Sequence, residues 1–272
     1  MPELPEVETT RSGIAPYVEG EVVSKVLVRN GRLRYIVPKA LAKMPVGQVV
    51  RRVDRRGKYL LFCLDGGTIM VHLGMSGSLC VVDEGLTPGK HDHVDMVLAS
   101  GVCLRYTDPR RFGSVLWVEG DVFEHRLLKH LGPEPLVRQF NARYLLTRAL
   151  GRKVLIKVLL MDSRVVVGVG NIYANEALFL AGIDPRMRCG DLTAESSKQL
   201  VKAVKQVLRR AIEAGGTTLK DFVNSEGKPG YFQQKLYVYG RGGEACRRCG
   251  GLIEHFKLGQ RSTYCCGNCQ DV

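Results

Sequence analysis

Residues 57–82, GKYLLFCLDGGTIMVHLGMSGSLCVV, consist of short runs rich in valine and leucine that are interrupted by glycine. The interruptions fall at Gly66-Gly67 and Ser76-Gly77, and each has the composition of a turn. Closely spaced short strands with such turns are typical of an antiparallel sandwich or barrel. Further runs of the same kind flank this stretch, at residues 21–30, 93–108 and 113–120.

One helix is predicted before the strands. Pro5 suits the first position of a helix, where its missing N–H removes no hydrogen bond. Four apolar residues recur at multiples of three to four residues, as on one face of a helix: Leu4, Val7, Ile14 and Val18.

The apolar period changes to that of helices from about Asp121. The last and longest predicted helix has a plausible cap in the Thr193/Ser196 region and ends at Gly215-Gly216. The fold class is therefore α+β with more than one domain, since 272 residues exceed the usual size of one domain. The predicted helical segments are residues 122–131, 142–150, 153–162, 171–183 and 193–216.

A linker is predicted where two prolines occur in LGPEPL, residues 131–136. Polar and glycine-containing residues 217–231 are predicted to form a loop after the longest helix. The predicted domains are an N-terminal β-sandwich at 1–130, a linker at 131–137, a helical domain at 138–235 and a cysteine-rich domain at 236–272.

The formal net charge of +13 indicates a polyanionic partner, most often nucleic acid bound through its phosphates. No apolar run is long enough for a membrane span, and the acidic N-terminus lacks the apolar core of a signal peptide. Nine cysteines in such a chain are expected as thiols or metal ligands rather than disulfides. We therefore expect a cytoplasmic protein without a membrane partner.

The pair Cys246-x-x-Cys249 is followed by Cys266-x-x-Cys269. Two such knuckles can wrap one tetrahedral Zn²⁺, because each supplies two thiolates from one tight turn. Cys265 could compete through a CxxxC spacing, but the CxxC spacing is commoner and favours Cys266. Four protein sulfurs leave no open position for water, so the predicted zinc ion is structural. Such a module can clamp nucleic acid or bind a protein, and alone it does not indicate an enzyme.

The first residues, MPELPE, permit two interpretations. Pro5 with the acids Glu3 and Glu6 is a good helix start, because carboxylates favour the positive end of the helix dipole. Alternatively, removal of Met1 would leave Pro2 as a free secondary amine. An α-amino group titrates near ~7.7–8.0, so a useful fraction could attack a sugar C1′ at neutral pH. Glu3 could then move protons during the reaction.

Several separated blocks together resemble the bacterial formamidopyrimidine-DNA glycosylase family, in order and over essentially the whole chain. The blocks are MPELPEVETTR (1–11), RRGKYLL (55–61), HLGMSGSL (72–79), KHDHVD (90–95), YTDPRRFG (106–113), GVGNIYANEALF (168–179), KPGYFQQKLYVYGR (228–241) and GQRSTYCCGNCQ (259–270).

This resemblance implies an enzyme that excises oxidised purines, notably 8-oxoguanine and formamidopyrimidines, from damaged double-stranded DNA. The enzyme would then cut the strand at the abasic site by β,δ-elimination. The implied fold is an N-terminal β-sandwich, a helical domain with a helix-two-turn-helix motif and a C-terminal β-hairpin zinc finger. We expect a monomer associated with the bacterial nucleoid.

The resemblance also implies catalytic residues. Pro2 would be the Schiff-base nucleophile and Glu3 the proton donor in base loss, with Glu6 arranging the site. Lys58 would contact DNA near the lesion and assist β-elimination. Arg261 would hold the flanking phosphates and assist δ-elimination.

Further matched positions imply DNA contacts. Met75, Arg110 and Phe112 would fill the gap left by the extruded nucleotide, since an inserted side chain recovers stacking energy. The loop at 217–231 would cover the flipped base. Three other residues match positions that touch DNA: His91, Arg152 and Asn171.

Ordinary structural roles remain open for these positions. Lys58 could be a solvated strand-edge lysine, Met75 a turn or core residue and Phe112 a core residue of the sandwich. Asn171 could cap a helix beginning at Ile172, although capping and phosphate binding can coexist. Two arginines could be solvated charge: Arg110 and Arg261.

Two positions depart from the family pattern. Position 265 is Cys where an aromatic residue is often expected, and position 152 is Arg where lysine is usual, which preserves charge but not geometry. Two other functions stay open beside the purine glycosylase: an endonuclease VIII-like enzyme for oxidised pyrimidines, and a non-catalytic zinc-containing DNA-binding protein. A zinc module for protein interaction is a third reading, which predicts no salt-sensitive DNA binding.

Overall fold

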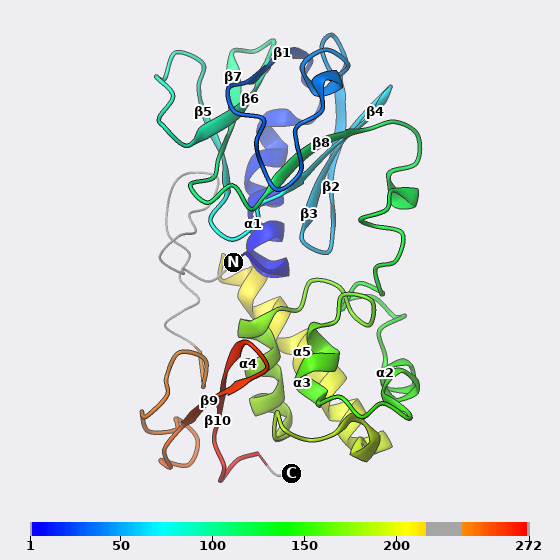
Figure 1. The fold of residues 1–272 in the computed structure, drawn as a ribbon, viewed down its shortest axis with the longest axis vertical. Helices are drawn as coiled ribbons and strands as arrows, with labels where there is room; N and C mark the ends of the chain where they lie inside the picture. The colour runs from blue at the N-terminus through cyan, green and yellow to red at the C-terminus, as the bar shows by residue number, and fades with distance from the viewer. Residues whose placement is uncertain (1, 216–235, 271–272) are drawn as a thin grey trace. The chain divides into compact units, whose positions relative to one another are not determined.

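The computed structural model describes residues 2–215 and 236–270. The chain divides into two compact units (Figure 1). The first comprises Met1–Lys129 with Ile212–Gln233, and the second comprises His130–Ala211 with Gln234–Val272. Among the described residues, no helix combines the length and the apolar character that a bilayer crossing requires.

The first unit is built on two antiparallel four-stranded sheets, which confirms the predicted sandwich. The sheet orders are β1-β6-β7-β5 and β2-β3-β4-β8. Residues 57–82 contribute strands to both sheets, with turns at the predicted glycines. The strand bounds are β1 Val23–Val28, β2 Val50–Arg56, β3 Tyr59–Leu64, β4 Gly67–His72, β5 Ser78–Asp83, β6 Asp92–Leu98, β7 Val102–Thr107 and β8 Ser114–Val118.

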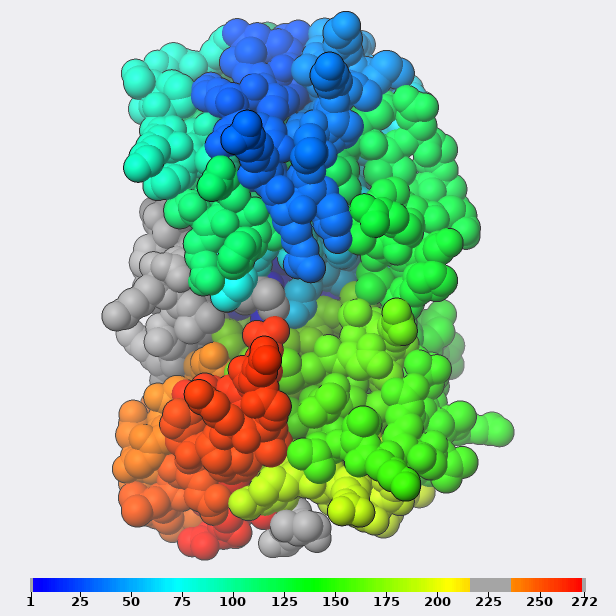
Figure 2. Space-filling model, viewed as in Figure 1, coloured from blue at the N-terminus to red at the C-terminus, as the bar shows by residue number. Residues whose placement is uncertain are grey.

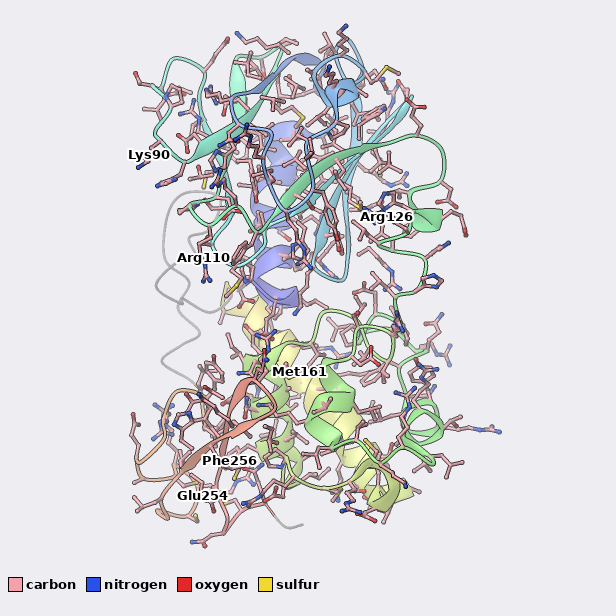
Figure 3. The ribbon with its side chains drawn as sticks, viewed as in Figure 1. Lys90, Arg110, Arg126, Met161, Glu254 and Phe256 are labelled. Atoms are coloured by element: carbon pink, nitrogen blue, oxygen red, sulfur yellow. The ribbon has the colours of Figure 1, made fainter. Side chains whose placement is uncertain are left out.

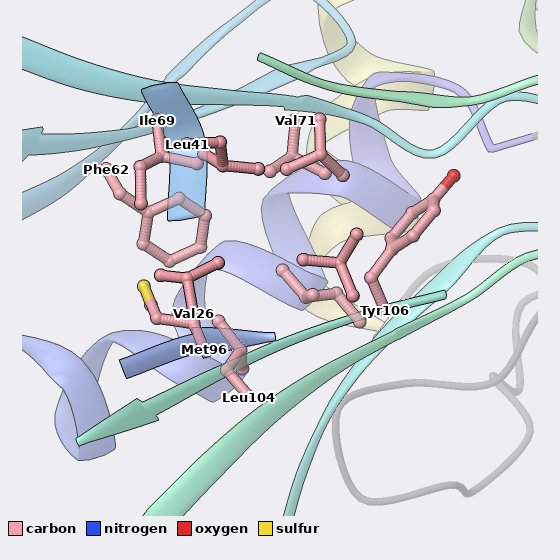
Figure 4. Close-up of a pocket in the computed structure, with 11 residues that line it drawn as sticks. Val26, Leu41, Phe62, Ile69, Val71, Met96, Leu104 and Tyr106 are labelled. Atoms are coloured by element: carbon pink, nitrogen blue, oxygen red, sulfur yellow. The ribbon is translucent and has the colours of Figure 1, made fainter. Parts of the chain in front are cut away.

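Apolar side chains from the two sheets meet in one core (Figure 4). Phe62 and Ile69 come from one sheet, and Met96 and Leu104 come from the other. These residues line a small apolar cavity, which Leu41 of the short 3₁₀ helix η1 (Lys39–Ala42) helps to close. Burial of this apolar surface is the main favourable contribution to folding.

Helix α1 (Leu4–Val18) packs on strand β2 of the first unit. The four apolar residues that predicted this helix are all buried. It begins one residue before Pro5, with Glu3 at the N-cap position.

Among its described residues, the second unit contains four α-helices, the 3₁₀ helix η3 and a two-stranded hairpin. Thr193 and Ser196 cap α5 as predicted, since the Thr193 N–H donates to Ser196 Oγ (2.9 Å) and the Ser196 N–H to Thr193 Oγ1 (3.1 Å). Gly182 ends α4 in the left-handed conformation that glycine adopts without strain. The bounds are α2 Ala142–Ala149, α3 Ile156–Met161, α4 Asn171–Ala181, η3 Cys189–Asp191, α5 Ala194–Glu213, β9 Glu254–Leu258 and β10 Arg261–Cys265.

The helix predicted at residues 122–131 is wrong. Only the 3₁₀ helix η2 (Val122–Glu124) forms, and turns follow it. The two buried apolar residues of this segment are Val122 and Leu128. Six residues of an α-helix rotate by about 240° beyond a full turn, so one helical face could not bury both side chains.

Candidate functional site

Glu3 and Glu6 form a reciprocal capping box at the start of α1. The Glu3 N–H donates to Glu6 Oε2 at 2.8 Å, and the Glu3 side chain accepts a hydrogen bond from the Glu6 backbone. Each acid is only 2% exposed, and Pro2 beside them is also buried. The helix-start reading is therefore confirmed, and the same bonds fix the Glu3 carboxylate next to Pro2.

Lys58 lies in the tight turn between β2 and β3, after Gly57, which adopts a φ of 57°. Arg55 ties this turn to α1, because its guanidinium donates to Gly57 O (2.9 Å) and to Glu8 Oε2 (2.7 Å). The position of Lys58 is thus linked to the helix that carries Pro2 and Glu3.

His72 is a neighbour of Lys58 that sequence reasoning missed. Burial and then the charges of Lys58 and Arg34 lower the pKa of His72 to about 4, so its ring is neutral at neutral pH. Its Nδ1 accepts a hydrogen bond from the Gly74 N–H (3.0 Å), which leaves the proton on Nε2. The available signal was its position as the first residue of HLGMSGSL.

Asp108, which is fully buried, joins the loops that carry Met75, Arg110 and Phe112. Its carboxylate accepts hydrogen bonds from Ser76 Oγ (2.8 Å) and from the Gly113 N–H (2.9 Å). It also accepts from two other donors, the Tyr106 hydroxyl (3.1 Å) and the Arg110 N–H (3.2 Å).

The two loops approach so closely that glycine is required between them. A Cβ at Gly74 would lie 2.4 Å from the Gly113 N, and a Cβ at Gly113 would lie 1.9 Å from the Tyr106 hydroxyl oxygen. Arg111 adopts a φ of 57°, unusual for a residue other than glycine. Arg110 is labelled in Figure 3. Its guanidinium lies 5.0 Å from the centre of the Phe112 ring, which is 45% exposed. Phe112 is therefore not a core residue of the sandwich.

His91 belongs to the same cluster, because its carbonyl accepts a hydrogen bond from the Asp108 N–H (3.0 Å). Arg105 fastens the neighbouring loop: it donates to Leu86 O (2.9 Å) and forms a buried ion pair with Asp95 (3.0 Å). The structure thus brings together four of the predicted DNA contacts of the first unit: Met75, His91, Arg110 and Phe112.

Asn171 and Arg261 are brought together in the second unit. The Asn171 side-chain N–H donates to the carbonyl of Ser262, the residue after Arg261, at 3.0 Å. The buried Lys157 ammonium donates to the same carbonyl (2.9 Å) and to Thr263 Oγ1 (2.7 Å). The helix starts at Asn171 with Gly170 as N-cap, so the reading of Asn171 as a side-chain cap is wrong.

Glu176 makes a further contact in the second unit. Glu176 of α4 accepts hydrogen bonds from the backbone N–H groups of Tyr237, Val238 and Tyr239 at 2.8–2.9 Å. Burial raises the pKa of Glu176, and these three N–H groups oppose that rise.

Arg152 lies apart from this contact network and forms a half-exposed ion pair with Asp162 (3.8 Å). The predicted loop at 217–231 lies outside the described residues.

The four predicted zinc ligands converge, with their sulfur atoms within 4.8 Å of one another: Cys246, Cys249, Cys266 and Cys269. A tetrahedral ion with bonds of about 2.3 Å requires sulfur atoms about 3.8 Å apart. The Cys249–Cys266 distance is 3.4 Å and the Cys246–Cys269 distance is 4.0 Å, so the geometry fits one structural zinc ion. Burial opposes ionisation of Cys246, but backbone N–H groups outweigh it and lower the pKa to about 7.

Cys265 is not part of the zinc site. It is fully buried at the end of β10, opposite Glu254, and burial raises its pKa to about 12. Gln270 fastens the second knuckle to the end of α4, because it accepts from the Cys266 N–H (2.9 Å) and donates to Ile183 O (2.8 Å). The zinc-binding region, orange to red, forms a continuous part of the surface of the second unit in Figure 2.

Three family models match the chain. They are the formamidopyrimidine-DNA glycosylase N-terminal domain at residues 1–115, the H2TH domain of the same family at 131–223, and the zinc finger found in FPG and IleRS at 243–272. Together with the two sheets and the four-cysteine cluster, they confirm the predicted fold class.

Curated relatives are similar over the full length. Formamidopyrimidine-DNA glycosylase of Shewanella halifaxensis is 57% identical over 272 residues, with both chains covered completely. The protein of the same name from Shewanella woodyi is 59% identical over 271 residues, which is 99% of each chain.

Solved structures are similar as well. The MutM (Fpg) protein from Thermus thermophilus has a TM-score of 0.89 and 39% identity, over 99% of this chain and 98% of that chain. A Lactococcus lactis Fpg mutant in complex with a Fapy-dG containing DNA has a TM-score of 0.93 and 32% identity, with both chains fully covered. With three family models and these full-length relatives in agreement, the chain belongs to the formamidopyrimidine-DNA glycosylase family.

Proposed function

We propose that this chain removes oxidised purines, namely 8-oxoguanine and formamidopyrimidines, from damaged double-stranded DNA and then cuts the strand at the abasic site. The observation that carries the proposal is the buried N-terminus of α1, where the capping box fixes the Glu3 carboxylate next to Pro2. A Lactococcus lactis relative of the same fold binds a Fapy-dG containing DNA, and another complex contains abasic-site DNA.

Chemistry begins at Pro2 once Met1 is removed. The lone pair of the Pro2 nitrogen attacks C1′ of the damaged nucleotide, and the C1′–base bond breaks as Glu3 supplies a proton. The Pro2 nitrogen of this adduct loses its N–H proton, and its lone pair then expels O4′, which takes up a proton as the C1′–O4′ bond breaks. The result is an iminium between Pro2 and the opened sugar, which acidifies C2′–H. Loss of the C2′ proton expels the 3′-phosphate as the C3′–O bond breaks, and a second elimination expels the 5′-phosphate as the C5′–O bond breaks.

Lys58 and Arg261 act on the DNA backbone around this reaction. Lys58 contacts the strand near the lesion and assists β-elimination, and Arg261 holds the flanking phosphates and assists δ-elimination. Asn171 binds the same backbone, which is supported by its hydrogen bond to the carbonyl of Ser262, the residue after Arg261. The four thiolates would hold one Zn²⁺ that has a structural role, so the zinc site stabilises the hairpin that carries Arg261.

Extrusion of the damaged base leaves a gap in the duplex that must be filled. Met75, Arg110 and Phe112 fill it, since an inserted apolar or planar side chain recovers part of the stacking energy. Their loops are braced on Asp108, which supports this role because a wedge must be rigid to hold a duplex open. Two further residues contact DNA: His91 and Arg152.

We assign the domain boundaries that the sequence predicts, with a catalytic sandwich at 1–130, a linker at 131–137, a helix-two-turn-helix domain at 138–235 and a zinc finger at 236–272. The protein acts as a monomer. It works in the cytoplasm and is associated with the nucleoid, because its substrate is chromosomal DNA.

Borohydride trapping on an 8-oxoguanine duplex, followed by mass mapping of the cross-linked peptide, tests the proposal. We expect a cross-link on Pro2 with Met1 absent. Preference for an oxidised-pyrimidine duplex would indicate an endonuclease VIII-like enzyme. Salt-sensitive DNA binding without any cross-link would indicate a non-catalytic DNA-binding protein.

A further inference from the structure

Helix α5 carries a straight row of four cations opposite its apolar face, defined here as the α5 basic stripe: Lys198, Lys202, Lys205 and Arg209. Lys205 is half-buried, and the other three are exposed. At 3.6 residues per turn these four positions fall within an arc of about 60° and extend over about 16 Å. The apolar residues of α5, such as Leu200, Val204 and Val207, are buried on the opposite side of the helix.

The stripe is not neutralised within its own helix. The acids of α5 are Glu195 and Glu213, which lie at its two ends, and none occurs between them. No ion pair of the four cations is recorded within residues 2–215 and 236–270. Like charges at three- and four-residue separations disfavour a helix, so this arrangement is unfavourable unless an anionic partner offsets it.

The stripe is also separate from the predicted contacts of the lesion site in the second unit. Those contacts use the start of α4, the β9–β10 hairpin and Arg152 in the segment between α2 and α3. By contrast, the hydrogen bonds recorded between α5 and other described segments involve Thr193, Ala142 and Val137. Lys205 donates one hydrogen bond to Val137 O (2.9 Å), which holds its ammonium in place and leaves two donors for a ligand.

The surroundings of the stripe favour one class of polyanion. A membrane-binding helix must release its apolar face, but that face of α5 is buried. Protein interfaces and single-stranded nucleic acids require apolar or aromatic side chains, and none of the exposed large apolar residues of the described chain lies on α5. A regular row of cations without such residues matches the sugar-phosphate backbone of a duplex.

We propose that the α5 basic stripe is a second, sequence-independent binding surface for double-stranded DNA, formed by residues other than those predicted to contact the lesion strand. A second duplex segment bound there would keep the enzyme near DNA during transfer between sites. Affinity at this surface depends on salt, with a slope of about 0.9 in log K per phosphate contact.

The test uses the full chain with its lesion site first loaded by a short duplex containing an uncleavable abasic analogue. A longer undamaged labelled duplex is then added, and formation of the ternary complex is measured against salt concentration. The variant Lys198→Glu/Lys202→Glu is compared with Lys39→Glu/Lys43→Glu, which changes the charge equally at exposed residues elsewhere.

We expect wild type and the control to form the ternary complex. The stripe variant should lose at least tenfold in affinity for the second duplex, and its salt slope should fall by about 1.8. Loading of the short lesion duplex and single-turnover excision should stay unchanged, so failure of the lesion site would be detected separately. Absence of a ternary complex in wild type, equal loss in both variants, or binding of the loaded protein to phosphatidylglycerol vesicles instead of DNA would overturn the proposal.

Discussion

Replacing Asp108 with Asn keeps the size of a buried side chain but removes its charge and one acceptor. The carboxylate accepts from Ser76 and Arg110 on one oxygen and from Tyr106 and Gly113 on the other. Three of these donors belong to the loops around Met75 and Phe112, and Tyr106 belongs to strand β7. Asp108→Asn therefore tests whether one carboxylate braces the groups that are proposed to hold the duplex open.

The magnitude follows from the geometry of the two oxygens. The less costly amide orientation keeps an oxygen towards Tyr106 and Gly113, where two charge-assisted hydrogen bonds become neutral at about 1 kcal/mol each. The amide nitrogen then faces Ser76 and Arg110, and the Arg110 N–H retains only a long contact with Ser76 Oγ (3.3 Å). A weakened buried donor adds about 1–2 kcal/mol, so the free energy of unfolding should fall by about 3–4 kcal/mol.

Urea unfolding measures this stability, and Asp83→Asn is the matched control because Asp83 is exposed at the end of β5. Function is measured well below the unfolding transition, by the fluorescence of 2-aminopurine placed opposite the lesion. We expect Asp108→Asn to bind the duplex but to unstack the opposite base less, with a lower single-turnover rate. A pre-opened substrate, with the lesion in a mismatch bubble, should restore most of that rate.

Two results would refute the reasoning about Asp108. Unchanged stability would mean that the four hydrogen bonds contribute little. Reduced excision that the mismatch bubble does not restore would mean that Asp108 acts on chemistry rather than on the bracing of the loops.

Three further predictions concern single groups. Burial opposes ionisation of Glu8, but hydrogen bonds from Arg11 and Arg55 outweigh it and lower the pKa of Glu8 below 4.5. The ionised Glu8 therefore stabilises the fold above that pH, and this contribution is lost as the pH falls through the lower pKa of the folded state. Glu8→Gln should make the free energy of unfolding, measured by urea unfolding at stepped pH, fall less steeply at acid pH. Lys58→Gln removes a positive neighbour and should raise the pKa of His72 from about 4, as followed by the histidine Cε1–H shift in NMR, and no change would place Lys58 away from that ring. Cys249→Ser should release zinc to a colorimetric chelator and weaken DNA binding, whereas Cys265→Ser should retain the metal, and retention in both would contradict the four-cysteine assignment.

Sequence reasoning succeeded where a feature is encoded locally. The strands of residues 57–82 were predictable because strand composition and glycine turns alternate over a few residues. The zinc ligands were predictable because each CxxC knuckle places two thiolates close together in one tight turn. The spacing alone favoured Cys266 over Cys265. The segment at 122–131 misled the prediction, because apolar and charged residues alternate with a helix-like period while its buried anchors do not share a helical face.

The missed residues are single polar groups whose partners lie far along the chain. Asp108 binds Ser76 across 32 residues, Glu176 binds Tyr237 across 61, and Lys157 binds Ser262 across 105. No periodicity or spacing rule connects such positions, since the sheet and the helices bring them together only after folding. Asp108 supports the loops that carry Met75 and Phe112, and Lys157 supports the hairpin that carries Arg261.

The N-terminus explains why local sequence could not decide between structure and catalysis. The capping box and the proposed active site use the same carboxylates, and the hydrogen bond from the Glu3 N–H to Glu6 serves both. A helix cap normally lies in solvent, where a carboxylate needs no fixed orientation to favour the dipole. Here both acids are 2% exposed, so each carboxylate is held without water and must be satisfied by fixed donors. Burial of two acids beside a buried Pro2 exceeds what a helix start requires, and it is what a proton donor held against a nucleophilic amine would require.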